Sequence, residues 1–219
     1  MASNTIDAKT SSNVNVQMSR RPSPIALAHI VLRTTPENYK KMVWFYQELL
    51  NGEIVLEEEA FVFLRYDYEH HRVGILKTPD TKPKEGDHAG LEHISFTFAT
   101  LTDMARIYQH LKDLGIEPYW AVNHGMTSSM YYRDPEKNKV ELQIENFDTP
   151  EEADAFVRGP LFQSNPIGTD IDPPSWADRI LSKMKPTGEE GLSESEMREI
   201  KLRREIGPRN TMPDYVLAP

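Results

Sequence analysis

The stretches Leu27-Ala28-His29-Ile30 and Leu91-Glu92-His93-Ile94 are two copies of one short pattern, leucine-x-histidine-isoleucine. Each copy opens an apolar, strand-like segment that leads through a threonine-containing turn into an amphipathic segment. The spacing of the apolar residues predicts one helix over 39–50, ended by Asn51-Gly52, and a second helix over 101–114. The sequence is therefore built on an internal repeat.

Three candidate strands follow each predicted helix. Thr35-Pro36 is predicted to begin the first helix as its N-cap and first-turn pair. The polar residues 68–71, which include His70 and His71, are predicted to form an exposed hairpin tip. The candidate strands are 53–58, 60–66 and 72–77 in the first copy, and 117–122, 127–133 and 139–144 in the second. The unit strand-helix-strand-strand-strand, used twice, predicts an α+β fold of two βαβββ modules that form one metal-centred cleft.

The composition divides the chain into three parts. Residues 1–22 are polar and are predicted to be a disordered tail, and residues 23–147 are the paired βαβββ metal-binding domain. Residues 148–219 are predicted to be a C-terminal extension with short helices over 176–184 and 193–206, because nine of the 16 prolines lie there and the repeat has ended. Its large apolar side chains predict that the extension packs against the modules or a partner subunit, and we expect a homodimer.

Charge and cysteine content exclude several classes of protein. The net charge of −9 argues against nucleic-acid binding, which needs a basic face. No apolar run approaches the roughly 20 residues of a membrane span, and no secretory signal is recognisable. The absence of cysteine excludes disulfides and thiolate metal sites and fits a cytoplasmic protein. A metal would have to be held by His, Asp or Glu.

His29, His93 and Glu141 share one position in their strands. Side chains alternate between the two faces of a strand, and each of these three lies opposite the face expected to pack on a helix. Two imidazoles and one carboxylate make the facial triad of non-haem Fe(II) sites, which leaves metal positions open. A single strand histidine is more often an ordinary core or surface residue. The recurrence of the histidine at the same place in both copies favours a metal site.

The repeat and the segment from Asp134 to Leu142 resemble the vicinal oxygen chelate superfamily. The segment reads Asp134-Pro135-Glu136-Lys137-Asn138-Lys139-Val140-Glu141-Leu142 and is similar to the family's "DPDGNxxEL" pattern, with Lys137 where glycine is usual. The resemblance covers residues 25–146. Members of the glyoxalase type use a fourth ligand, Glu or Gln, on the last strand of the first copy, and residues 72–77 contain neither. The pattern that remains looks most like the type I extradiol catechol dioxygenases.

This resemblance implies a ring-cleaving dioxygenase that takes a catechol-like aromatic diol and O2. The metal is expected to be Fe(II), or alternatively Mn(II), held by His29, His93 and Glu141. The segment Asn123-His124-Gly125 resembles the extradiol stretch whose histidine is an active-site acid or base, and Tyr131 matches a tyrosine that hydrogen-bonds the substrate. Two alternatives remain open: a metal-dependent lyase or epimerase of the glyoxalase type, and a non-catalytic small-molecule binding protein of the same fold.

Overall fold

The computed structural model describes residues 22–86 and 89–217, so residues 1–21 of the predicted tail lie outside the described part of the chain. Both copies of the repeat fold as strand, helix and three strands, as expected. The first copy consists of β1 (Ile30–Thr34), α2 (Tyr39–Leu50), β2 (Glu53–Glu57), β3 (Phe61–Arg65) and β4 (Val73–Lys77). The second copy consists of β5 (His93–Thr97), α3 (Leu101–Asp113), β6 (Trp120–Asn123), β7 (Thr127–Arg133) and β8 (Lys139–Glu145).

Each copy forms its own mixed sheet. The strand orders are β1-β4-β3-β2 in the first sheet and β5-β8-β7-β6-β9 in the second. The first and last strands of each copy pair in parallel, β1 with β4 and β5 with β8, whereas the other pairs are antiparallel. This arrangement confirms the predicted α+β fold of two βαβββ modules, and it gives His29 and His93 equivalent places at the start of their copies.

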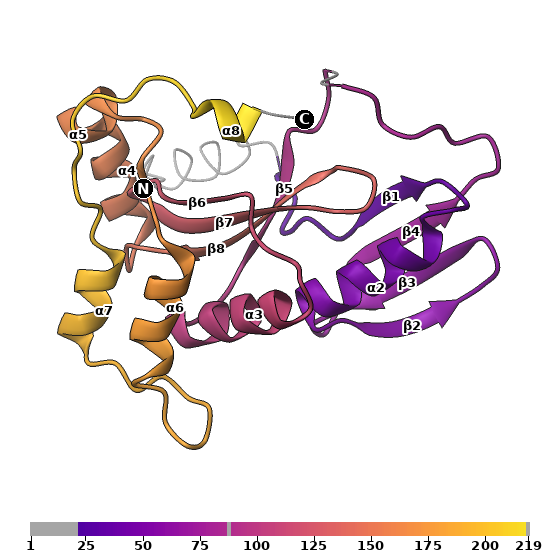
Figure 1. Cartoon of the computed structure of the whole chain (residues 1–219), viewed down its shortest axis with the longest axis horizontal. Helices are drawn as coiled ribbons and strands as arrows, with labels where there is room; N and C mark the ends of the chain where they lie inside the picture. Colours follow the sequence, from indigo (N-terminus) through magenta and orange to yellow (C-terminus); the bar gives the residue numbers. More distant parts are fainter. Residues whose placement is uncertain (1–21, 87–88, 218–219) are drawn as a thin grey trace, which may run out of the picture.

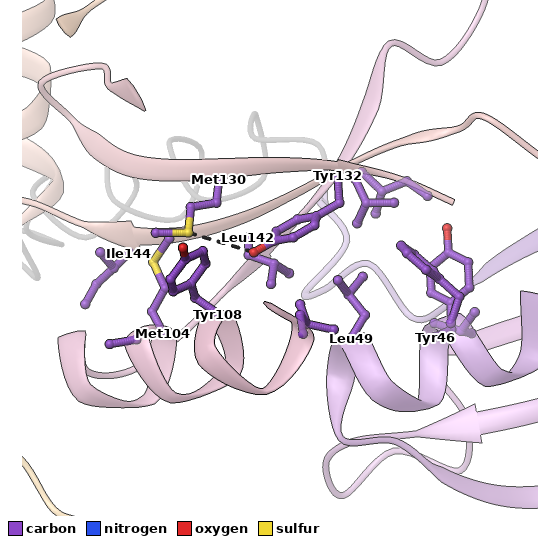
Figure 2. Packing of buried hydrophobic residues seen from close by; sticks show 14 of the residues in the cluster. Tyr46, Leu49, Met104, Tyr108, Met130, Tyr132, Leu142 and Ile144 are labelled. Atoms are coloured by element: carbon purple, nitrogen blue, oxygen red, sulfur yellow. Dashed lines mark hydrogen bonds between the residues drawn. The ribbon is translucent and has the colours of Figure 1, made fainter. Parts of the chain in front are cut away.

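One hydrophobic core runs through both copies. Helices α2 and α3 lie on the same side of the two sheets (Figure 1). Helix α3 packs on β8, with Met104 and Tyr108 beside Met130 and Leu142 in Figure 2, whereas α2 packs on β3, β4 and α3 through residues that include Tyr46 and Leu49. Because this core occupies one face of each sheet, residues on the opposite face, such as Glu141, are available for a site.

Helix α2 begins at Tyr39, so the prediction that Thr35-Pro36 starts it was wrong. Asn38 occupies the N-cap position without a side-chain cap bond, and residues 36–38 form a turn. The physical reason is that Thr35 is engaged elsewhere: its backbone N–H and its hydroxyl both donate to the Glu136 carboxylate, at 2.8 and 2.9 Å. The Thr35 hydroxyl oxygen also accepts from the Asn38 N–H at 3.3 Å, so Thr35 closes the turn over residues 36–38 while it binds Glu136.

The turn between β7 and β8 joins the second copy to the first. Glu136 is 6% exposed, and Thr34 donates to it at 2.7 Å in addition to the two bonds from Thr35. Two residues earlier, the buried Asp134 accepts a hydrogen bond from the Tyr46 hydroxyl of α2 at 3.0 Å. These bonds fix the β7–β8 hairpin against the end of β1 and against α2.

The C-terminal extension packs on the second copy. Trp176, Ala177 and Ile180 of α6 join the main core, and α6 lies against α3. The short strand β9 pairs with β6, so the extension adds a fifth strand to the second sheet. Across residues 22–86 and 89–217, no helix has the length and apolar character of a membrane span. The elements of the extension are α4 (Pro150–Arg158), α5 (Pro160–Ser164), β9 (Thr169–Asp170), α6 (Pro173–Leu181), α7 (Glu194–Lys201) and α8 (Asp214–Leu217).

Replacing Lys137 by glycine is expected to stabilise the folded protein. The Lys137 φ angle of 64° is in the left-handed region, where a side chain costs about 1 kcal/mol and glycine costs little. We expect Lys137→Gly to raise the free energy of unfolding by up to about 1 kcal/mol, measured by urea denaturation. The control Lys40→Gly, at an exposed position within α2, should lower it by about 1 kcal/mol. A loss of stability in Lys137→Gly would contradict the strain assigned to this turn.

Replacing Glu136 by alanine is expected to destabilise the folded protein. Glu136→Ala removes the acceptor of three hydrogen bonds and leaves buried donors of Thr34 and Thr35 unsatisfied. We expect the free energy of unfolding to fall by about 3 kcal/mol, measured by the same denaturation. Glu145→Ala, at an exposed position of β8, is the control and should change stability by less than about 0.5 kcal/mol. Equal effects of the two variants would mean that the turn does not hold the copies together.

Candidate active site

His93 and Glu141 meet on the face of the second sheet that points away from α3. The parallel pairing of β5 with β8 places Ser95 opposite Glu141, with His93 two residues before Ser95 on the same face. The His93 Nε2 atom lies 3.1 Å from the Glu141 Oε2 atom. The side-chain faces alternate as predicted, since Val140 and Leu142 on either side of Glu141 belong to the core, although Glu141 on the opposite face is buried as well.

Glu141 is a buried carboxylate that stays ionised. Only 4% of the Glu141 residue is exposed to solvent. Burial alone would raise its pKa, but hydrogen bonds with His93, Ser129, Ser95 and Tyr131 outweigh burial and hold the pKa at about 2. The same contact acts on the partner: the hydrogen bond with Glu141 raises the pKa of His93, against an opposing effect of burial. When His93 is protonated, the two groups form an ion pair.

Tyr131 and His124 extend this arrangement into a chain of hydrogen bonds. The Tyr131 hydroxyl donates to the Glu141 Oε1 atom at 2.9 Å and lies 3.0 Å from the His124 Nε2 atom. Burial, followed by the charge of Glu141, raises the pKa of Tyr131, so the phenol keeps its proton. Trp120 stacks on the Tyr131 ring at 5.0 Å and fixes its plane.

His124 is held as a neutral ring with a defined tautomer. Its Nδ1 atom lies 2.6 Å from the Ile167 carbonyl oxygen, which can only accept, so Nδ1 carries a proton. Burial lowers the pKa of His124, and the ring is therefore uncharged near neutral pH. Its Nε2 atom then presents a lone pair to the Tyr131 hydroxyl. The structure thus brings together four of the five predicted site residues: His93, Glu141, Tyr131 and His124.

His29 lies apart from these four. It precedes β1, is exposed, and packs its ring against His71 at 4.3 Å between centroids. Within the described residues, no three His, Asp or Glu side chains surround a common point closely enough for a metal. His29 and Ser95 nevertheless line one cavity of about 280 Å³, and Ser95 is a hydrogen-bond partner of Glu141. The donor chemistry therefore fits a divalent metal, with two donors in contact and the third on the wall of a neighbouring cavity.

The burial of His71, beside His29, is a feature that sequence reasoning missed. The prediction of an exposed hairpin tip was wrong for this residue, because His71 is only 9% exposed. Its ring stacks on Phe63 at 4.4 Å and contacts His29, and burial lowers its pKa.

Comparison with known proteins agrees with this geometry. The sequence profile of the Glyoxalase/Bleomycin resistance protein/Dioxygenase superfamily matches residues 26–142. A protein of Rhodococcus globerulus named biphenyl-2,3-diol 1,2-dioxygenase 2 is 43% identical over 147 residues, which cover 67% of this chain and 76% of the relative. A second protein of that organism, biphenyl-2,3-diol 1,2-dioxygenase 3, is 40% identical over 173 residues, covering 78% of this chain and 86% of the relative.

A more distant relative carries a metal in its name. The manganese-dependent 2,3-dihydroxybiphenyl 1,2-dioxygenase of Geobacillus genomosp. 3 is 32% identical over 94 residues, which cover 42% of this chain and 27% of that protein. The profile match spans more than half of the chain, and the two Rhodococcus proteins are matched over at least three quarters of their length. Together with the two βαβββ copies, these matches establish that the chain belongs to the Glyoxalase/Bleomycin resistance protein/Dioxygenase superfamily.

Proposed function

We propose that this protein is an extradiol-type dioxygenase that cleaves a catechol-like aromatic diol with O2. The observation that carries the proposal is the buried hydrogen-bond chain from His93 through Glu141 and Tyr131 to His124. It combines metal-binding donors with two groups that can move a proton beside them. The names of the relatives at 43% and 40% identity support the same reaction class.

We propose His29, His93 and Glu141 as the metal ligands. His93 and Glu141 come from the second copy, and His29 comes from the first, so the metal would join the two modules. A divalent metal held by two imidazoles and one carboxylate retains open positions at which a diol and O2 bind side by side. The ligand set suits Fe(II), and the manganese-dependent relative supports Mn(II) as the second candidate.

Tyr131 and His124 are proposed to handle the substrate proton. The Tyr131 hydroxyl has one proton but two acceptors, the Glu141 carboxylate and the His124 Nε2 atom. If Glu141 held a metal, the Tyr131 hydroxyl could donate to the His124 Nε2 atom instead, since that atom lies 3.0 Å away. The Nε2 lone pair of neutral His124 can then accept a proton from the diol by way of the tyrosine and return it later in turnover.

Two other functions within the fold are less well supported. A lyase or epimerase of the glyoxalase type would need a fourth ligand on β4, and Val73–Lys77 contains neither Glu nor Gln. A non-catalytic binding protein would have no need for an ionised carboxylate buried against His93 and Tyr131. Uptake of O2 with a catechol separates the dioxygenase from both.

The metal site predicts a loss of bound metal in three variants. Protein purified without oxygen should contain one Fe or Mn per chain by elemental analysis, and His29→Ala, His93→Ala and Glu141→Ala should each lose most of it. O2 uptake with a panel of catechols should fall below about one thousandth of the wild-type rate in each. His110→Ala is the control, because His110 is exposed on α3 and pairs with Glu48. Full metal content in His93→Ala would exclude the proposed ligand set.

The His93–Glu141 pair predicts how metal binding depends on pH. Glu141, with a pKa of about 2, is already ionised, so the proton that competes with the metal is on His93. The pKa of His93 is raised above its ordinary value of 6.5. As the pH is lowered, affinity for Mn(II) should therefore begin to fall while the pH is still above 6.5. Below the raised pKa it should fall by about tenfold per pH unit for this one proton. Mn(II) titrations by calorimetry between about pH 5 and pH 9 measure this, and constant affinity over that range would contradict the assignment of His93.

A further inference from the structure

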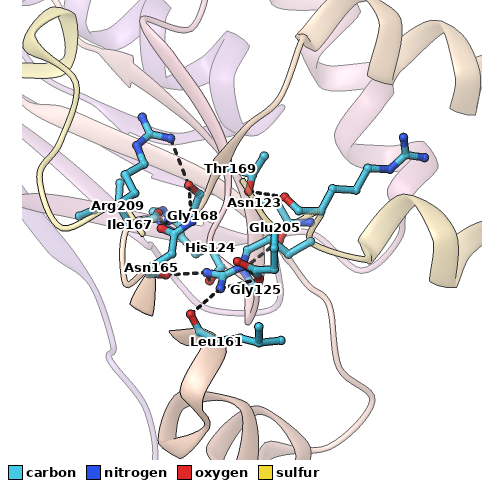
Figure 3. A network of polar contacts seen from close by, with 12 residues as sticks. Asn123, His124, Gly125, Leu161, Asn165, Ile167, Gly168, Thr169, Glu205 and Arg209 are labelled. Carbon is cyan, nitrogen blue, oxygen red and sulfur yellow. Dashed lines mark hydrogen bonds and ion pairs between the residues drawn. The ribbon is translucent and has the colours of Figure 1, made fainter. Parts of the chain in front are cut away.

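Arg203 of the C-terminal extension is buried against the segment that carries His124. Arg203 is 7% exposed, and its guanidinium group donates to three backbone carbonyls, one beside β6 and two at α5. The Nη1 atom donates to His124 at 3.0 Å and to Asn165 at 2.8 Å, and the Nη2 atom donates to Leu161 at 3.1 Å. Figure 3 shows these three residues gathered in one network.

The guanidinium group is fully used in this position. Its Nε atom donates to the Glu205 carboxylate at 2.7 Å, and its plane lies over the Phe156 ring at 4.9 Å. A planar fork of donors is required to reach several carbonyls at once, and a lysine offers only a single ammonium group. Burial of a charge is costly unless it is paired and hydrogen-bonded, as it is here. Apolar side chains would be enough to attach the C-terminal extension to the second copy, so a buried guanidinium group indicates a further role.

The extension also fixes the ring of His124. The Ile167 carbonyl that receives the Nδ1 proton sits in a turn closed by the buried side chain of Asn165, which accepts from the Gly168 N–H at 2.7 Å. The backbone of Gly168 passes so close to Asn123 that an added Cβ atom would lie 2.3 Å from the Asn123 carbonyl oxygen. The turn and the close approach of Gly168 to Asn123 therefore fix the position of the Ile167 carbonyl in the absence of substrate.

A third contact holds the segment from its other side. The Asn123 side chain donates to the Lys201 carbonyl at 2.9 Å and accepts from the Gly125 N–H at 2.9 Å. At Gly125 a Cβ atom would lie 2.1 Å from the Phe156 ring, so the backbone is pressed against the extension. His124 is thus enclosed by fixed groups on its main chain and on Nδ1, and only its Nε2 atom faces the site.

We propose that Arg203 is a positioning residue for His124: with the Ile167 carbonyl, it holds the ring in the Nδ1-protonated tautomer with the Nε2 atom aimed at the Tyr131 hydroxyl. The C-terminal extension is then a working part of the active site. This inference rests on the proposed function, in which His124 handles a proton.

Two substitutions of Arg203 and one control test the inference. Arg203→Met keeps the length of the side chain and removes every donor, and Arg203→Lys keeps the charge without the fork. The control is Arg204→Met, at an exposed neighbouring residue whose side chain pairs with Glu199. Arg203→Met should retain its metal and a KM within about threefold of wild type, but lose roughly 10²-fold in kcat, the effect of a misplaced catalytic group. Arg203→Lys should recover part of kcat, and Arg204→Met should match wild type.

A spectroscopic measurement follows the tautomer itself. In metal-free, full-length protein labelled with ¹⁵N-histidine, the His124 signal is identified by its loss in His124→Phe. It should show protonated Nδ1 and unprotonated Nε2 in wild type, and a mixture of tautomers in Arg203→Met. Protonated Nε2 in wild type, or unchanged kcat and tautomer in Arg203→Met, would overturn the inference.

The two proposals fail in distinguishable ways. Absence of O2 uptake by the wild type with every catechol would contradict the dioxygenase, and the tautomer would still report whether Arg203 positions His124. If Arg203→Met does not fold, the test uses the spectrum of the wild type together with the spectrum and the kinetics of Arg203→Lys. If Arg203→Lys has the tautomer and the rate of the wild type, the planar guanidinium donors are not needed, and the inference is overturned.

Discussion

The contact between Glu136 and the threonine pair at the end of β1 is the constraint on which the site depends. Glu136 lies at the tip of the β7–β8 hairpin, and it accepts three hydrogen bonds from Thr34 and Thr35 of the first copy. The same hairpin carries Tyr131 on one strand and Glu141 on the other. Fixing its tip therefore sets the position of both side chains relative to the first copy, which supplies the third proposed metal ligand, His29.

Much of this architecture could be predicted from local sequence signals. The apolar periodicity of 39–50 and 101–113 gave both helices, and alternation within 93–97 and 139–145 gave the correct faces for His93 and Glu141. Such signals work where an element must bury one side and expose the other. They failed at Thr35, a good helix cap by type: the helix begins only after a turn over residues 36–38, and Thr35 donates to a glutamate about one hundred residues away.

The environment of the site residues was less accessible to sequence reasoning. His71 looked like a surface residue because its neighbours in the chain are polar, whereas its burial comes from Phe63 and His29. Likewise, His124 could be recognised by its neighbours, but nothing local indicates that Ile167 and Arg203 hold it. These contacts join segments about forty and eighty residues apart, and no periodicity encodes them.

The two sheets end in different ways, and this affects how readily another strand could extend each of two edges. An edge strand offers unpaired N–H and C=O groups on which another chain can add a strand. In the second sheet β9 covers part of the β6 edge, with Asp170 opposite Val122. In the first sheet β2 is one of the two edge strands, with β1 the other, and it exposes Val55 and Leu56, but its pairing with β3 is interrupted by an irregularity between Ile54 and Leu56. That break bends the edge and makes it a poor template for further strands. At these two edges, the C-terminal extension covers part of β6, and an irregular pairing with β3 interrupts β2.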